Sequence, residues 1–374
     1  MNRRGKISDW KANHVMNYRL GILSDLLNED GTFTFPNYSL RRLHQPEKVS
    51  IVRIRGHAVL SQSVAQDVDF LISVPTGTAV TSLSLEPNCR LLAIVRVGVG
   101  CEDIDLAACT NAGVAVVLPA EAVIRPTAVA ALTLMLALAT RLIEKDRLTR
   151  LGAGKWGRRS ELQGWNLHGK VLGLVGCGGI GSQFAAYARA LGMDVIAFDP
   201  ALSAGDAKDL GITLQDLPQV LSGSDYLSIH CPLNAETKHL IDQGRLSLMK
   251  AEACLINTAR GGIVDQEALY AALSAGRLRG AALDVFDPEP LPESEPLLKL
   301  DNVIFSAHAL NWTHELDREI ADANIEAINS LLAGRFPDKI ANPAVLSNER
   351  FRRKLANLSS HDEISKSAIN RISQ

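Results

Sequence analysis

Short apolar runs alternate with polar stretches through the first third of the chain. Strands that are buried on both faces appear in a sequence as nearly continuous apolar runs, so the alternation predicts a parallel β-sheet with crossover helices. The expected strands cover residues 19–23, 49–53, 69–74, 91–96 and 114–117.

The same rhythm returns at Lys170 and continues to Ser306. Helical segments such as 182–191 and 266–275 separate the apolar runs. Short buried strands in a βαβ order are what a doubly wound dinucleotide-binding domain requires. The expected strands cover 171–175, 194–198, 226–230, 253–257, 280–284 and 302–306.

Longer apolar or amphipathic stretches predict two further helices. One begins at about Thr127 and contains the apolar run Ala128–Ala139, which is too short to span a bilayer and therefore indicates a buried helix. The other covers about 316–333. Residues 347–374 are polar and lack a convincing apolar period, so we expect a poorly ordered tail with room for a short helix.

Composition narrows the class of protein. Of the 374 residues, 47% are hydrophobic and 21% are charged, which is typical of a soluble globular protein of two or three domains. The net charge of −2 indicates neither a nucleic acid nor an anionic membrane as partner. The first residues lack the apolar core of a secretion signal, and six scattered cysteines without a Cys-x-x-Cys pair indicate reduced thiols, so we expect a cytoplasmic protein.

A glycine-rich turn follows the first strand of the second series. It has the form Gly176-x-Gly178-Gly179-Ile180-Gly181. The first glycine permits a tight turn, the second lets a pyrophosphate approach the backbone, and the last allows close packing of helix and strand. The helix expected from about Ile180 directs free N–H groups at the phosphates. The turn therefore predicts a dinucleotide site.

An acidic residue, Asp199, ends the next expected strand, roughly 20 residues after the last glycine. A carboxylate there accepts hydrogen bonds from the ribose hydroxyls of the adenosine and repels a 2′-phosphate. No arginine follows closely to bind such a phosphate. The position favours NAD over NADP.

Three residues with the chemistry to reduce a 2-oxo acid follow later strands. Arg260 can bind a carboxylate and polarise a carbonyl, and His308 is the natural acid and base. Glu289 can hydrogen-bond the other imidazole nitrogen and hold the required tautomer. Because ligands of open α/β sheets bind at the carboxyl ends of strands, we expect the three to share one edge. His230 follows a comparable strand and remains an alternative acid.

These motifs together resemble the D-isomer-specific 2-hydroxyacid dehydrogenase family. The resemblance runs from about Leu91 to Pro343. It rests on residues 96–105 (RVGVGCEDID), 167–170 (LHGK), the glycine-rich turn, 230–234 (HCPLN), 257–262 (NTARGG), 284–290 (DVFDPEP) and 307–308 (AH).

The resemblance implies two doubly wound parallel-sheet α/β domains with a cleft between them. A flavodoxin-like substrate domain would cover 1–120 and 310–346, and a Rossmann NAD-binding domain would cover 121–309. The family uses NAD and no metal, and forms homodimers through its NAD domains, which the long helix and its 141–159 extension fit.

The resemblance also assigns roles to single residues. Arg260, Glu289 and His308 would be catalytic, and the backbone of Gly98 and Val99 would help to hold the substrate carboxylate. Three further residues would line the cofactor: Cys231, Thr258 and Asp284, the last at the nicotinamide carboxamide.

Two segments depart from the family pattern. The family has Ser-Val-Ala-Glu entering the long helix, where this chain has Pro126-Thr127-Ala128-Val129 after Arg125. The family has Pro before the catalytic His and a Gly-rich stretch after it, where this chain has Ala307 and Ala309–Trp312. Both segments border the expected substrate pocket, so the sequence does not identify which 2-hydroxy acid is the substrate.

The leading hypothesis is hydride transfer between NAD(H) and a D-2-hydroxy acid and 2-oxo acid pair. Oxidation of a small acid such as phosphite on the same scaffold is an alternative, whereas Glu289 argues against formate oxidation because the formate enzymes have Gln there. A non-enzymatic, NADH-sensing scaffold similar to the corepressors of this fold is the alternative from another class.

Overall fold

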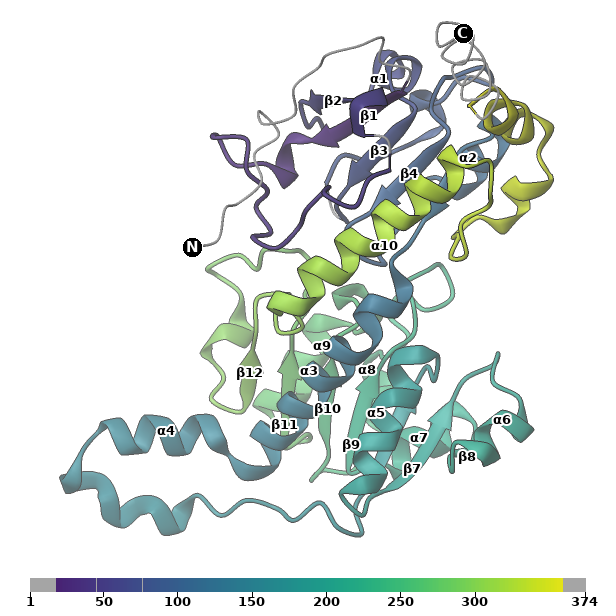
Figure 1. The fold of residues 1–374 in the computed structure, drawn as a ribbon. Coiled ribbons are helices and arrows are strands. Elements are labelled where there is room, and N and C mark those ends of the chain that lie inside the picture. Colours follow the sequence, from purple (N-terminus) through teal and green to yellow (C-terminus); the bar gives the residue numbers. More distant parts are fainter. Residues whose placement is uncertain (1–17, 45, 76, 359–374) are drawn as a thin grey trace, which may run out of the picture. The chain divides into compact units, whose positions relative to one another are not determined.

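The computed structural model describes residues 18–44, 46–75 and 77–358 and divides the chain into two compact units. The first unit contains the residues up to Val123 and those from Thr313 onward, and the second contains Ile124–Trp312. Helix α3 (Ala120–Thr140) begins in the first unit and continues in the second (Figure 1).

The first unit is built on a parallel sheet with the strand order β2-β1-β3-β4-β5. This is the doubly wound order of flavodoxin-like folds, which confirms the expected fold class. The strands are β1 (Tyr18–Leu23), β2 (Val49–Ile54), β3 (Phe70–Ser73), β4 (Ala93–Arg96) and β5 (Ala115–Val117). The other elements are α1 (Gln62–Asp67), α2 (Leu106–Ala112), α10 (His314–Leu332) and the 3₁₀ turns η2 (Ser24–Leu26), η3 (Pro46–Lys48), η4 (Ser82–Ser84) and η8 (Pro343–Ser347).

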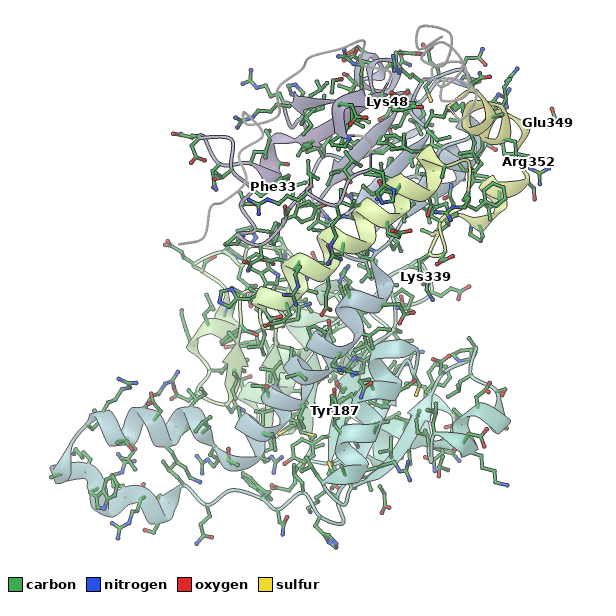
Figure 2. All side chains as sticks on the ribbon, viewed as in Figure 1. Phe33, Lys48, Tyr187, Lys339, Glu349 and Arg352 are labelled. Carbon is green, nitrogen blue, oxygen red and sulfur yellow. The ribbon has the colours of Figure 1, made fainter. Side chains whose placement is uncertain are left out.

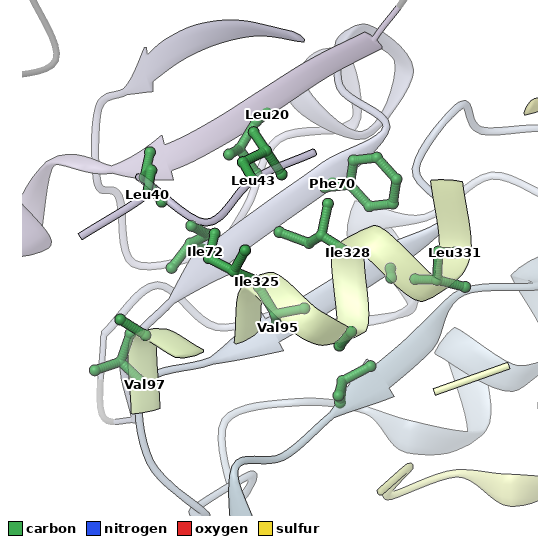
Figure 3. Packing of buried hydrophobic residues seen from close by; sticks show 14 of the residues in the cluster. Leu20, Leu40, Leu43, Phe70, Ile72, Val95, Val97, Ile325, Ile328 and Leu331 are labelled. Carbon is green, nitrogen blue, oxygen red and sulfur yellow. The ribbon is translucent and has the colours of Figure 1, made fainter. Parts of the chain in front are cut away.

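Apolar side chains cover both faces of this sheet. On one face, Ile325, Ile328 and Leu331 of α10 pack against the strands, as Figure 3 shows. On the other face, Cys109 of α2 and Ala65 of α1 belong to a second buried cluster. Burial on both faces explains why the strands appear in the sequence as continuous apolar runs.

The segment after η8 agrees with its prediction in one respect and differs in another. Residues 349–358 form a helix, for which the prediction left room, but this helix is packed into the unit and is not part of a poorly ordered tail. Phe351, Leu355 and Leu358 are buried in the core of the first unit, whereas Glu349 and Arg352 on the same helix are exposed (Figure 2). The rest of the expected tail, 359–374, lies outside the described residues.

The buried face of this helix is also tied to the sheet by polar contacts. Lys354 Nζ donates hydrogen bonds to the carbonyls of Leu91 and Ala112, both at 2.8 Å. Tyr18 Oη donates to the carbonyl of Leu358 at 3.0 Å. The helix is therefore an integral part of the first unit.

The second unit contains a seven-stranded parallel sheet with the order β12-β11-β10-β9-β6-β7-β8. Numbered within the unit this is the Rossmann order, with the switch point between β6 and β9. The strands are β6 (Val171–Val175), β7 (Asp194–Phe198), β8 (Thr213–Leu214), β9 (Tyr226–Ile229), β10 (Cys254–Asn257), β11 (Gly280–Leu283) and β12 (Val303–Phe305). Strand β8 was not predicted, because two residues are too few to produce an apolar pattern.

Helices and turns connect the strands of the second unit. They are α4 (Leu142–Arg150), α5 (Gly179–Ala190), α6 (Ala204–Asp209), α7 (Leu217–Gly223), α8 (Gln243–Leu246), α9 (Gln266–Ser274), η5 (Ala153–Glu161), η6 (Gly261–Ile263) and η7 (Pro296–Lys299). In Figure 1, α4 and the segment after it extend away from the sheet as an arm.

Helix α3 is longer than the apolar run that predicted it. Its length of 21 residues and the mean hydropathy of 1.8 over an 18-residue window would suffice to cross a membrane. However, 56% of that window is buried inside the protein. Ala128, Ala131 and Met135 are fully buried against the sheet of the second unit. These contacts are those of a core helix.

Candidate active site

The glycine-rich turn connects β6 to α5 at the switch point of the second sheet. Gly176 has φ of 92°, and a Cβ there would lie 2.5 Å from the backbone nitrogen of Cys231. A Cβ on Gly181 would lie 2.5 Å from the carbonyl oxygen of Gly176. Gly178, the N-cap of α5, has open space where its Cβ would be. The turn therefore offers a bare backbone surface at a helix N-terminus, which suits a pyrophosphate.

Two neighbours complete the description of this turn. A Cβ on Gly179 would lie 2.6 Å from Cδ1 of Ile124, so this glycine permits close packing against α3. Ile180 is the second residue of α5 and is partly exposed.

Asp199 lies one residue past β7 and is tied to the turn. Its Oδ2 accepts a hydrogen bond from the backbone N–H of Cys177 at 2.6 Å, and its Oδ1 accepts one from Ala201 at 2.8 Å. Each carboxylate oxygen can accept a second bond, so both remain able to bind ribose hydroxyls. The same bonds hold the acid and the glycine-rich turn in a fixed relation.

Two further residues fit a dinucleotide at this edge. Thr258 Oγ1 is buried and has no hydrogen-bond partner among the described residues, as expected of a hydroxyl that hydrogen-bonds a ligand. Cys231 is partly exposed, and burial of its thiol raises the pKa to about 11. The Cys231 thiol is therefore neutral and not a thiolate nucleophile.

His308 and Glu289 lie together at the carboxyl ends of neighbouring strands. His308 follows β12, Glu289 follows β11, and 2.8 Å separates His308 Nδ1 from Glu289 Oε2. The other carboxylate oxygen, Oε1, accepts the backbone N–H of Phe286 at 2.8 Å. Burial alone would raise the pKa of Glu289, but the bonds from His308 and Phe286 and the charge of Arg260 hold that pKa below its usual value. Glu289 is thus a carboxylate at neutral pH.

Arg260 reaches the same region from β10. It precedes η6, and its Nη1 donates to the carbonyl of Ala259 at 2.6 Å. The next residue, Gly261, explains why the loop after β10 lies so close to the loop that leads to Glu289. A Cβ on Gly261 would overlap the backbone of Phe286 in that second loop. Only glycine lets the two loops pack this closely.

Asp284 holds the loop that carries His308. The resemblance places Asp284 against the nicotinamide, and its side chain lies at the end of β11 with 3% of its surface exposed. Its Oδ1 accepts backbone N–H bonds from Ala309 at 3.2 Å and Leu310 at 3.4 Å. The sequence did not indicate that Asp284 also holds this loop, because the groups that it binds belong to the backbone 25 residues away.

The alternative acid, His230, has a different environment. Its Nε2 lies 2.9 Å from Ser228 Oγ, and its ring makes an edge contact with Phe184 at 5.7 Å. Removal of this ring from water lowers the pKa of His230 to about 4. A ring that is neutral at pH 7 and bonded to a hydroxyl is a poor proton donor, which favours His308.

In the first unit, Gly98 and Val99 lie on a loop whose backbone is hydrogen-bonded by the Arg96 side chain. Gly98 has φ of 129°, a conformation that favours glycine. The Arg96 side chain is fully buried and donates to the carbonyl of Gly100 from Nε at 3.1 Å and Nη2 at 3.0 Å. Nη2 also lies 2.6 Å from Asp103 Oδ1. Sequence reasoning missed Arg96 because arginine is seldom fully buried.

No group of three or more His, Cys, Asp or Glu that could bind a metal occurs within the described part of the chain.

Comparisons with known proteins give the site its context. A profile of the D-isomer specific 2-hydroxyacid dehydrogenase NAD binding domain matches residues 132–309. A glyoxylate reductase of Korarchaeum cryptofilum is 36% identical over 283 residues, which are 75% of this chain and 85% of the relative. A D-3-phosphoglycerate dehydrogenase of Methanocaldococcus jannaschii is 37% identical over 76% of this chain and 54% of the relative. The chain thus spans about half the length of the phosphoglycerate dehydrogenases that it matches.

A solved structure supports the same assignment. The holo D-mandelate dehydrogenase of Rhodotorula graminis superimposes with a TM-score of 0.74 at 25% identity, covering 87% of this chain and 98% of the other. The second unit is accordingly the NAD-binding domain, and the chain belongs to the D-isomer-specific 2-hydroxyacid dehydrogenase family.

Proposed function

We propose that this protein transfers a hydride between NAD(H) and a D-2-hydroxy acid and 2-oxo acid pair. The observation that carries the proposal is the 2.8 Å contact between His308 and Glu289, at strand ends shared with Arg260. NADH, when bound at the glycine-rich turn, supplies the hydride. The protein residues bind the acid, orient it and move the proton.

His308 is the proposed acid and base. Its Nδ1 is engaged by Glu289, which leaves Nε2 to exchange a proton with the substrate oxygen. Glu289 stays ionised, so it stabilises the protonated imidazole through a charge-assisted hydrogen bond and fixes its orientation. When the 2-oxo acid is reduced, the proton passes from Nε2 to the oxygen, and it returns in the reverse reaction.

Arg260 is the proposed anchor of the substrate. Its planar guanidinium can bind a carboxylate through two bonds and polarise the adjacent carbonyl, which a lysine cannot do in the same geometry. The backbone of Gly98 and Val99 is proposed to bind the carboxylate as well. The support is that Arg96 holds this loop in a fixed conformation.

NAD is the proposed partner over NADP. The carboxylate of Asp199 is held at the turn by Cys177, where it accepts ribose hydroxyls and repels a 2′-phosphate.

The test is consumption of NADH and NADPH by the purified protein with glyoxylate, hydroxypyruvate, pyruvate and bulkier 2-oxo acids. We expect turnover on one size class with NADH preferred. Phosphite with NAD⁺ is the parallel assay, and turnover there alone would support phosphite oxidation. Tight NADH binding without turnover on any acid would contradict the dehydrogenase and support the NADH-sensing scaffold.

We further propose a homodimer formed through the NAD-binding domains. The support is the arm of α4 and η5, where Leu142, Leu151 and Trp156 are 56%, 62% and 52% exposed. Such apolar side chains on a projecting segment are typical of an interface. Light scattering should give a dimer mass, and Leu151→Glu should reduce it. The control Leu248→Glu, at a leucine that is 44% exposed elsewhere in the unit, should not.

A cytoplasmic location is proposed on the cysteines. Four of the six are buried and form no disulfide: Cys89, Cys109, Cys177 and Cys254. Unpaired buried thiols are typical of a reducing compartment. Fractionation of the source cells, followed by immunodetection, tests the location.

A further inference from the structure

The chain passes between its two units at two places, after Val123 in α3 and after Trp312. The second crossing directly follows the loop 308–312, which begins with the proposed acid His308. His308 has φ of 50°, a left-handed conformation that non-glycine residues seldom adopt. Such a conformation persists where the surrounding contacts enforce it. The contacts of this loop therefore decide where the imidazole lies.

A side-chain hydrogen bond joins this loop to α3. Asn311 Nδ2 donates a hydrogen bond to Thr127 Oγ1 at 3.1 Å, across 184 residues of sequence. Thr127 is 8% exposed and Asn311 is half-buried, so the bond is largely shielded from water. The two preceding residues are bound in another way, because Ala309 and Leu310 donate backbone N–H groups to Asp284.

Both partners lie in the two segments that depart from the family pattern. By the resemblance, Thr127 lies at the Val position of Ser-Val-Ala-Glu, and Asn311 lies within the segment that corresponds to the Gly-rich stretch. Valine has no hydroxyl, so that run lacks the acceptor of this bond. Two separate departures thus meet in one contact.

We propose that Thr127 and Asn311 are positioning residues that fasten the His308 loop to α3. They do not touch the reacting atoms. They act through His308, whose Nε2 must stay within about 0.5 Å of its productive place for proton transfer. The Asp284 bonds secure the start of the loop and the Asn311 bond secures its end, so the loop is held on both sides of Leu310. The inference rests on the proposed dehydrogenase function for its kinetic consequence.

The kinetic test uses Thr127→Val, which removes the acceptor and keeps the shape of the side chain. A neutral hydrogen bond of this kind corresponds to roughly a three- to tenfold loss in kcat for 2-oxo acid reduction, with KM unchanged. Rates are expressed per NADH-binding site, measured by fluorescence titration, so that an inactive fraction does not imitate the loss. The lower kcat at an unchanged KM is the readout that a purely structural role would not produce.

Thr133→Val is the matched control. It is the same substitution on the same helix, at a hydroxyl that donates to the carbonyl of Val129 within α3. It should leave kcat and KM unchanged. Asn311→Ala should reproduce the effect of Thr127→Val, and the double variant should be no slower than either single variant, because both remove one interaction.

Hydrogen exchange of the peptide that covers 307–312, measured without substrate, tests the fastening independently of turnover. Faster exchange in Thr127→Val and Asn311→Ala, but not in Thr133→Val, is the expected result. Unchanged exchange, or a kcat for Thr127→Val equal to that of Thr133→Val, would overturn the proposal. If the unmodified protein reduces no 2-oxo acid, the proposed function fails, while the exchange result still decides whether the loop is fastened.

Discussion

Replacing Glu289 with Gln tests the central pair of the site. The amide keeps the size of the side chain but removes the charge that stabilises a protonated His308. The bond is 2.8 Å long, and the His308 and Glu289 side chains are 37% and 26% exposed, so solvent screens it in part. A charge-assisted hydrogen bond in such a setting contributes about 2 kcal/mol, the lower part of its usual range. Since about 1.4 kcal/mol corresponds to a factor of ten, we expect kcat/KM to fall roughly thirtyfold.

The pH profile of Glu289→Gln should change in a defined direction. Gln does not titrate, so the loss of kcat/KM at low pH that comes from protonation of Glu289 should be absent from the variant. In the unmodified protein, the pKa of Glu289 is held below its usual value, so the pair is intact at neutral pH and is lost only as the pH falls through that lowered pKa.

Glu293→Gln is the matched control, because it makes the same change of charge at an exposed position of the same loop. Steady-state reduction of the preferred 2-oxo acid would be compared for the three proteins from neutral pH downward. A Glu289→Gln variant with kcat/KM within twofold of Glu293→Gln, and with the same loss at low pH, would refute the assignment of the pair.

Three further predictions concern the acid, the cofactor and the C-terminal helix. His308→Gln should lower kcat by roughly two to four orders of magnitude with NADH binding retained, and near-normal turnover would reject His308 as the acid. Asp199→Asn should reduce the preference for NADH over NADPH by about tenfold in kcat/KM, whereas an unchanged ratio would show that Asp199 does not select the cofactor. Phe351→Ala should lower the free energy of unfolding by about 3–5 kcal/mol in denaturant titrations, because it empties a fully buried site. The exposed Phe336→Ala should cost far less, and equal losses would mean that the C-terminal helix is not part of the core.

The fold was predictable because its sheets are buried on both faces. In the strands from Leu20 to Phe305 this burial makes the apolar runs continuous. The glycine-rich turn and Asp199 each follow the end of one such run. Residues 349–358 were not predicted as a core helix. Phe351, Leu355 and Leu358 have helical spacing, but charged residues surround them, and the helix depends on tertiary contacts such as those of Lys354.

The candidate site was predictable as a set of residues but not as a set of contacts. Arg260, Glu289 and His308 each follow a strand, and parallel strands bring their carboxyl ends to one edge. The partners of Arg96 and Asp284 were not predictable in the same way, because they are backbone groups of loops. The bond between Thr127 and Asn311 joins positions that no local pattern relates.

Three contacts of the candidate site follow a common physical rule. In each, a polar side chain at or near a strand end binds the backbone of a loop that carries candidate site residues: Asp199 binds the glycine-rich turn, Asp284 binds the loop after His308, and Arg96 binds the loop of Gly98. Loops have few apolar contacts to fix them, so their backbone needs partners from the rigid sheet. A residue that is proposed to bind a ligand, such as Asp199 or Asp284, can thus also be required to hold the conformation of a loop. Substitutions such as Asp199→Asn, which keep the shape and change the charge, therefore separate the two tasks better than alanine does.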